Sequence, residues 1–243
     1  MDDVLEIRDL KVWFPIRKGV FARTVGYVKA VDGVSFRMRR GETLGVVGES
    51  GSGKSTIARV VSGLQRPTSG EVKLGGRVGM VFQDPLGSLN PRMTVRATLG
   101  EVPGCRGGER HSELLGLVGL DASALDKYPH EFSGGQRQRI CIARAIAARP
   151  DLLICDEAVS ALDMAIRSQV LDLLGDLKAR LGLSLMFITH DLGVVQHMAD
   201  SLIVMHSGKI VEEGDCAEVL RSPKAEYTRY LMESVPRIGK PLA

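Results

Sequence analysis

The chemistry most clearly indicated by the chain is anion binding between residues 48 and 55. This stretch reads Gly-Glu-Ser-Gly-Ser-Gly-Lys-Ser and fits the pattern G-x-x-x-x-G-K-[ST] of phosphate-binding loops. Because glycine lacks a Cβ atom, successive backbone N–H groups can turn inward around an anion. In such a loop Lys54 reaches the β- and γ-phosphates, and the hydroxyl group of Ser55 holds Mg²⁺. The alternative is a glycine-rich turn with an exposed lysine, and the flanking elements decide between the two.

A pair of carboxylates follows an apolar run further along the chain. Asp156 and Glu157 come directly after Leu152-Leu153-Ile154-Cys155, and such a run is typical of a buried parallel strand. Ligands of α/β sheets bind at the carboxyl ends of the strands. Asp156 suits the oxygen ligands that Mg²⁺ prefers, and Glu157 suits a general base for water that attacks a γ-phosphate. The plainer alternative is an acidic turn after a buried strand.

A third candidate is the sequence Ser133-Gly134-Gly135-Gln136, which precedes a predicted helix from Arg137 to Arg149. Ser133 and Gln136 have the spacing of a capping box, so a well-capped helix explains the pattern. Two glycines at a helix start, with arginines nearby, also form an anion site. The residues alone leave both interpretations open.

Three further positions lie at the ends of predicted strands. Gln83 and His190 each follow an apolar strand, where a polar side chain can reach a phosphate or simply satisfy a backbone group. Trp13 and Phe14 end the first predicted strand, and an exposed aromatic ring there could stack on adenine. A core or edge aromatic is the alternative.

The elements around the glycine loop have the order that the motif requires. Thr43 to Val47 predicts a buried strand before the loop, and Thr56 to Leu64 has helical apolar spacing until Arg66-Pro67. Strand, glycine loop and helix together favour nucleotide binding over an accidental turn.

The N-terminal part alternates in the manner of strands. Val4 to Val12 predicts a strand that ends at Trp13 and Phe14, and a connection then runs to about Gly26. Val28 to Arg39 predicts one or two strands broken at Asp32-Gly33. After the loop helix we expect a turn at residues 68–70 and short strands over 71–74 and 78–82.

The rest of the chain falls into two parts that differ in composition and in their hydrophobic pattern. Residues 84 to about 150 contain several prolines and glycines and short helical patterns, which indicates a mostly helical insertion. The last part alternates between strand and helix, which predicts parallel βαβ units in an α/β sheet. The predicted elements there are a strand at 152–155, a helix at 165–181, a strand at 184–189, a helix at 192–198 and a strand at 201–205.

Composition excludes several classes of protein. A formal net charge of +3 without a basic tract gives no support for nucleic-acid binding. The four cysteines form no C-x-x-C pair, which argues against a zinc or iron–sulfur site and fits reduced thiols in a cytosol. No apolar run approaches the roughly 20 residues needed to span a bilayer, and the start Met1-Asp2-Asp3 is not typical of a secretory signal. We therefore expect any membrane link to come through a partner.

Taken together and in order, these motifs resemble those of the ATP-binding-cassette (ABC) ATPases, over nearly the whole chain. Ser160-Ala161-Leu162-Asp163 after the carboxylates fits the same family. The resemblance implies an α/β fold, with a P-loop NTPase (RecA-like) core, an N-terminal antiparallel β part and an inserted α-helical subdomain. One ABC ATP-binding domain would cover residues 1–243, with its core at about 1–83 and 151–243 and its helical subdomain at about 84–150.

The resemblance also assigns roles to residues, with ATP and Mg²⁺ as cofactors. Two cassettes face each other head to tail, so that the 133–136 segment serves the partner's nucleotide and Asp163 lies across the interface. Phe14 aligns with the adenine-stacking aromatic, with Trp13 as the second choice. The implied nucleotide-binding residues are Phe14, Gly48, Glu49, Ser50, Gly51, Ser52, Gly53, Lys54, Ser55, Thr56, Ser133, Gly134, Gly135, Gln136 and Asp163. The implied metal ligands are Ser55, Gln83 and Asp156, and the implied catalytic residues are Glu157, His190 and Gln83.

A narrower resemblance is to the oligopeptide, dipeptide and nickel uptake branch. It rests on residues 83–95, on 128–132 before the second glycine motif, and on Tyr227-Thr228-Arg229. It implies an ATPase that powers solute import from the cytoplasmic face of the membrane, together with a second cassette chain, transmembrane permease subunits and an extracytoplasmic solute-binding protein, and no nucleic acid. The alternatives are a soluble cassette ATPase acting on nucleic acid or ribosomes, and a small-molecule P-loop kinase.

Overall fold

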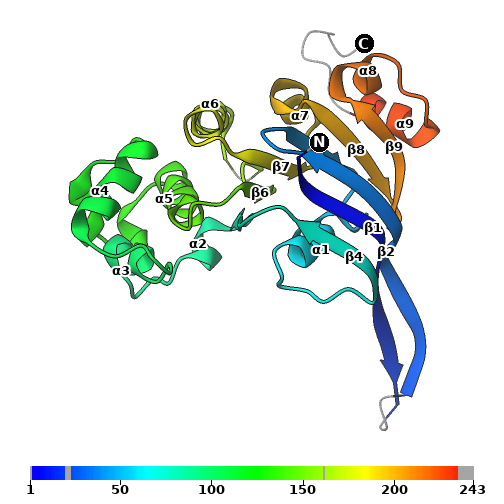
Figure 1. The fold of residues 1–243 in the computed structure, drawn as a ribbon, viewed down its shortest axis with the longest axis horizontal. Helices are drawn as coiled ribbons and strands as arrows, with labels where there is room; N and C mark the ends of the chain where they lie inside the picture. Colours follow the sequence, from blue (N-terminus) through cyan, green and yellow to red (C-terminus); the bar gives the residue numbers. More distant parts are fainter. Residues whose placement is uncertain (1, 20–22, 161, 235–243) are drawn as a thin grey trace. The chain divides into compact units, whose positions relative to one another are not determined.

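The computed structural model describes residues 2–19, 23–160 and 162–234. Within these ranges the chain forms two compact units (Figure 1). Unit 1 comprises residues 1–6, 37–42 and 73–187, and unit 2 comprises residues 7–36, 43–72 and 188–243. The predicted residue Ala161 lies outside the described residues.

Unit 2 contains the glycine loop between a buried strand and a helix. The strand β3 (Thr43–Val47) pairs in parallel with β8 (Ser201–His206), and β8 pairs antiparallel with β9 (Lys209–Asp215). All five residues of β3 are buried, as the apolar run predicts. The helices of this unit are α1 (Lys54–Val61), α7 (Leu192–Met198), α8 (Cys216–Arg221) and α9 (Glu226–Ser234).

A second, three-stranded sheet has the order β2-β1-β4 and lies mostly in unit 2. Its strands are β1 (Asp3–Lys18), β2 (Arg23–Arg39) and β4 (Ser69–Leu74). Three expectations about this region are wrong. β1 continues past Trp13 and Phe14, β2 is not broken at Asp32-Gly33, and β4 begins inside the expected turn.

Sheet pairing explains these differences. Past Trp13 and Phe14, β1 keeps β2 as its neighbour, so its backbone groups find partners beyond the end of the alternating pattern. The N–H group of Thr68 already donates to the carbonyl oxygen of Lys11 at 2.7 Å, which starts the pairing of β4 one residue before the strand. Gly33, with a φ of 82°, lets β2 pass its irregular point without a break.

Unit 1 places a parallel strand pair beside a set of helices. β5 (Val78–Val81) pairs in parallel with β6 (Leu152–Asp156), and β7 (Ser184–Thr189) is the next strand in the order. The helix α5 (Gly134–Ala147) contacts β5 and four other helices, and most of its residues are buried. Those helices are α2 (Pro85–Ser88), α3 (Val95–Gly100), α4 (Gly108–Leu117) and α6 (Met164–Leu181), and the short 3₁₀ helices are η1 (Ala122–Asp126) and η2 (Pro129–Glu131).

The parallel pairs, the loop between β3 and α1, and the helices within residues 84–150 confirm the predicted α/β class. Figure 1 shows α3, α4 and α5 grouped together within the insertion, which is green. The four cysteines are buried free thiols, and burial raises the pKa of Cys155 to about 12 and that of Cys141 to about 11. Among the described residues, no helix has both the length and the apolar character needed to cross a membrane.

Candidate functional site

The glycine loop of unit 2 is held in shape by its own lysine. The ammonium group of Lys54 donates to the carbonyl oxygens of Gly48 and Glu49, at 2.7 Å each, and lies 3.4 Å from the hydroxyl oxygen of Ser52. Lys54 is 4% exposed. A buried ammonium group at the centre of a loop is a strong electrostatic attraction for phosphate oxygens. The ammonium group of Lys54 therefore lies where the predicted contact with phosphate requires it.

Gly53 shows why the motif requires glycine at this point. It is the N-cap of α1 with a φ of 107°, and a Cβ atom there would overlap the carbonyl oxygen of Ala30. The chain can therefore turn sharply into the helix, whose first N–H groups have no partner within the helix. Ser55 and Thr56, both half-buried, begin this helix beside the loop.

The two aromatic candidates differ in their surroundings. The indole N–H group of Trp13 donates to the Asp32 carboxylate at 3.1 Å, and the Lys29 ammonium group lies 4.5 Å from the Trp13 ring centroid. Phe14, the neighbouring residue in β1, is 40% exposed. The ring of Trp13 is thus already engaged within the protein, which favours Phe14 as the stacking residue.

His190 follows β7 as an exposed residue of unit 2. The loop around it is fixed by short hydrogen bonds: the N–H group of Asp191 donates to Thr189 Oγ1 at 3.0 Å, and Asp191 accepts from the N–H group of Gly193 at 2.9 Å. The side chain of His190 thus extends from a well-defined turn.

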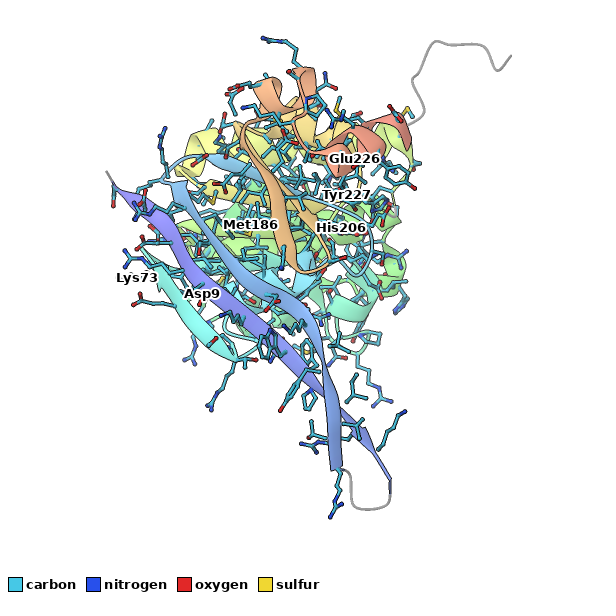
Figure 2. All side chains as sticks on the ribbon, turned by 90° about the vertical axis from the view of Figure 1, so that its right-hand side faces the viewer. Asp9, Lys73, Met186, His206, Glu226 and Tyr227 are labelled. Carbon is cyan, nitrogen blue, oxygen red and sulfur yellow. The ribbon has the colours of Figure 1, made fainter. Side chains whose placement is uncertain are left out.

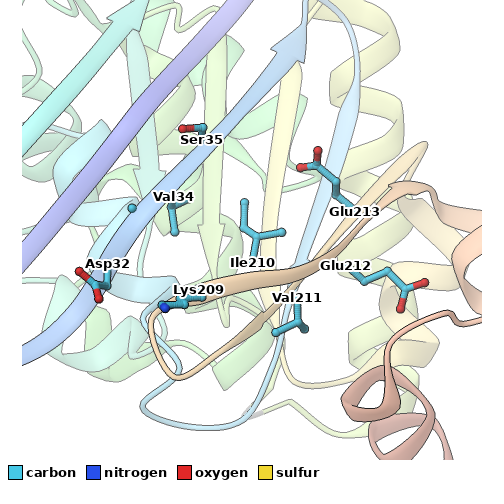
Figure 3. A pocket seen from close by; sticks show the side chains of 9 residues that line it. Asp32, Val34, Ser35, Lys209, Ile210, Val211, Glu212 and Glu213 are labelled. Carbon is cyan, nitrogen blue, oxygen red and sulfur yellow. The ribbon is translucent and has the colours of Figure 1, made fainter.

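Unit 2 also has a hollow of about 550 Å³ between β2 and β9 (Figure 3). It is lined by Asp32, Gly33, Val34, Ser35, Lys209, Ile210, Val211, Glu212 and Glu213. Lys209 is the cation of this lining, and the acidic residues Asp32 and Glu212 are bonded elsewhere, to Lys29 and to the N–H groups of Lys224 and Ala225, so the hollow does not favour a polyphosphate.

In unit 1, Glu157, the predicted general base, is hydrogen-bonded to Gln83. The side-chain Nε2 of Gln83 lies 3.2 Å from Oε2 of Glu157, to which it donates. Glu157 has a φ of 48°, in the left-handed region that residues other than glycine seldom adopt. The carbonyl oxygen of Glu157 accepts from the Ser160 hydroxyl group at 2.9 Å and from the Ser160 N–H group at 3.2 Å. A strained backbone fixed in this way is a feature that clusters at functional sites.

Asp156 ends the fully buried strand β6 and is itself 7% exposed. Its carboxylate is a hard oxygen donor of the kind that Mg²⁺ prefers, which fits the role predicted for it from the sequence. Among the described residues, no group of three or more His, Cys, Asp or Glu side chains could hold a metal ion.

The second glycine motif forms the capping box that its sequence indicates. The Ser133 hydroxyl oxygen accepts from the Gln136 N–H group at 3.3 Å, and Gln136 Oε1 accepts from the Ser133 N–H group at 2.9 Å. Asp163 caps α6 in a similar way, accepting from the Ile166 N–H group at 3.0 Å. These side chains therefore have structural partners within the chain, whether or not they also serve a nucleotide.

Gly135 and Gly134 allow a matched stability test in this motif. A Cβ atom on Gly135 would lie 2.5 Å from Cγ2 of Ile166, whereas one on Gly134 would meet nothing within 4 Å. We expect Gly135→Ala to lower the free energy of unfolding by about 1–3 kcal/mol through overpacking. Gly134→Ala should be neutral or stabilising by up to about 1 kcal/mol. Urea unfolding of both variants measures this, and equal midpoints would contradict the close approach.

Comparison with known proteins shows which family this chain belongs to. The sequence profile described as "ABC transporter" matches residues 31–160, more than half of the chain. This chain belongs to the ABC transporter family. The predicted enzyme activity, ATP hydrolysis by an ABC cassette, is thereby confirmed.

Relatives of this ABC transporter chain match it almost from end to end. The oligopeptide transport ATP-binding protein AppF of Bacillus subtilis is 46% identical over 97% of this chain and 79% of its own length. The dipeptide transport ATP-binding protein DppF of Escherichia coli is 44% identical over 97% of this chain and 77% of its own length.

Solved structures share the cassette fold. The ATP-binding cassette MJ0796, in a dimeric post-hydrolysis state bound to ADP and Pi, superposes with a TM-score of 0.74 at 25% identity, over 87% of this chain and 98% of its own. CbiO1 of Clostridium perfringens, part of the transporter complex cbiONQ, gives a TM-score of 0.75 at 27% identity, over 98% of each chain.

Proposed function

We propose that this chain is the ATPase subunit of a peptide importer. The observation that carries the proposal is the 46% identity with AppF over 97% of the chain. The chain would act at the cytoplasmic face of the membrane, bound to permease subunits that receive peptide from an extracytoplasmic solute-binding protein. Both relatives reported above are named for peptide transport, whereas the narrower resemblance also allows nickel import.

In the proposed mechanism two cassettes close head to tail around ATP. The loop at residues 48–56 of one chain binds the phosphates, Phe14 stacks on adenine, and the segment 133–136 of the other chain completes the site. Asp163 lies at the seam between the chains. Closure removes water and strengthens every charge interaction with the triphosphate.

Hydrolysis then depends on one side chain that acts on the attacking water molecule and one that acts on the γ-phosphate. Glu157 accepts its proton, with Gln83 holding the carboxylate through the 3.2 Å hydrogen bond, and His190 orients the γ-phosphate. The oxygen donors of Ser55, Gln83 and Asp156 would hold Mg²⁺, which neutralises charge on the phosphates. Product release opens the pair, and this motion drives the permease.

Permease contact is expected in the proposed helical subdomain, at about residues 84–150, directly after Gln83. Leu86 in α2 lies three residues after Gln83 and exposes 57% of its surface, so its side chain is available to a partner. We expect Leu86→Ser to reduce recovery of the tagged chain with the permease from detergent-solubilised membranes by roughly tenfold, the effect of an interface anchor. ATP binding should not change.

Leu64→Ser is the matched control, because Leu64 in unit 2 is 61% exposed. It should retain full co-purification. Equal recovery of both variants would reject Leu86 as a contact, and a wild-type chain that never associates with a membrane protein would reject the importer itself.

A further inference from the structure

A single peptide group of the glycine loop is held from both of its sides. The carbonyl oxygen of Gly48 accepts from Lys54, and the N–H group of Glu49, which belongs to the same peptide, donates to the hydroxyl oxygen of Tyr227 at 3.1 Å. In a trans peptide these two groups point in opposite directions. The orientation of this peptide is thus set by the loop lysine on one side and by a residue 178 positions away on the other.

We propose that Tyr227 is a positioning residue for nucleotide binding, which holds the Gly48–Glu49 peptide in the orientation that the phosphate loop requires. The inference rests on the proposed function of this loop. When ATP binds, the ammonium group of Lys54 has to share its three N–H donors between these carbonyl oxygens and the phosphates, which weakens its support of the loop. The Tyr227 hydroxyl group does not depend on Lys54 and keeps the peptide in place.

The ring of Tyr227 is fixed well enough for this role. Its centroid lies 4.1 Å from that of His206, the last residue of β8, and Figure 2 shows the two side chains next to each other. Tyr227 also packs against a buried cluster that includes Val47, the residue directly before the loop. Burial raises the pKa of the Tyr227 hydroxyl group, which therefore stays protonated and neutral at physiological pH.

A buried carboxylate anchors the start of α9, the helix that carries Tyr227. Glu212 of β9 is 9% exposed and accepts from the N–H groups of Lys224 and Ala225, at 2.8 and 3.0 Å. Burial alone would raise the pKa of Glu212, but hydrogen bonds, first among them that from Lys224, lower it overall. The carboxylate stays charged, so the segment that positions Tyr227 is connected to the sheet of unit 2.

The test removes one oxygen atom from the ring. We expect Tyr227→Phe to weaken binding of MgATP and MgADP by roughly three- to tenfold, the effect of one lost hydrogen bond. The KM for ATP should rise by a similar factor while kcat changes little, which a merely structural residue would not produce. Tyr230→Phe, the same change at a residue of α9 that is 56% exposed, should bind like the wild type. Isothermal titration of the full chain measures the affinities.

Two outcomes separate failure of this inference from failure of the proposed function. If Lys54→Ala loses affinity for MgATP but Tyr227→Phe binds it like the wild type, the positioning role is wrong. The role is also wrong if Tyr227→Phe and Tyr230→Phe lose affinity by the same factor. If Lys54→Ala binds nucleotide normally, the phosphate loop itself is wrongly assigned and the positioning role falls with it.

Discussion

Glutamine in place of Glu157 should reduce steady-state ATP hydrolysis by roughly 10²-fold or more, while ATP affinity stays close to that of the wild type. An amide cannot accept the proton of the attacking water. Gln83, which donates to Glu157 across 3.2 Å, can still donate to an amide oxygen, so the local geometry is retained. Phosphate release under saturating MgATP gives the rate, and titration gives the affinity.

The backbone of Glu157 provides a second test of the same role. Its φ of 48° is expected to cost about 1–3 kcal/mol, a strain that glycine would not have. Glu157→Gly should therefore fold at least as well as Glu157→Gln and be equally inactive. Glu101→Gln, at an exposed carboxylate of unit 1, should hydrolyse normally. Normal turnover in Glu157→Gln would reject the general base.

When hydrolysis is blocked, the dimer of two cassettes closed around ATP should also accumulate. We expect Glu157→Gln to shift from monomer to dimer in size-exclusion chromatography when MgATP and the proper partner cassette are present. Failure of any two cassettes to associate under these conditions would contradict the head-to-tail arrangement on which the proposed mechanism depends.

Elements with strong local patterns could be predicted from the sequence. The strand at 184–189 and the helix at 192–198 match β7 and α7 in both bounds. The course of β1 past Trp13 was not predicted, because Pro15 and the glycines after it indicated a connection, whereas pairing with the neighbouring strand β2 continues β1 to Lys18. The elements β9, α8 and α9 were not predicted from the sequence.

In the candidate site, too, local motifs were predictable and contacts between distant residues were not. Motif spacing predicts roles for Lys54, Asp156 and Glu157, and the capping box at Ser133 was expected and is present. The contact between Gln83 and Glu157, and the left-handed backbone of Glu157, depend on how β5 and β6 lie side by side. The bond from Glu49 to Tyr227 left no pattern in the sequence, because a single polar contact needs no periodicity.

Alanine in place of Lys54 should weaken binding of MgATP by roughly 10- to 100-fold, the effect of a lost charge-assisted hydrogen bond. The ammonium group is also the link between two carbonyl oxygens of its own loop, at 2.7 Å each, so the empty loop should loosen as well. Isothermal titration gives the affinity, and hydrogen exchange of the amides at residues 48–53 reports the loosening.

Two variants separate the charge of Lys54 from its bulk. Lys54→Met retains most of the side-chain volume at this buried position but has no ammonium group, so it should lose nearly as much affinity as Lys54→Ala. Lys127→Ala removes an exposed lysine of unit 1 and should bind like the wild type. If Lys54→Met binds MgATP as tightly as the wild type, the ammonium group does not contact phosphate, and the assignment of the phosphate loop is wrong.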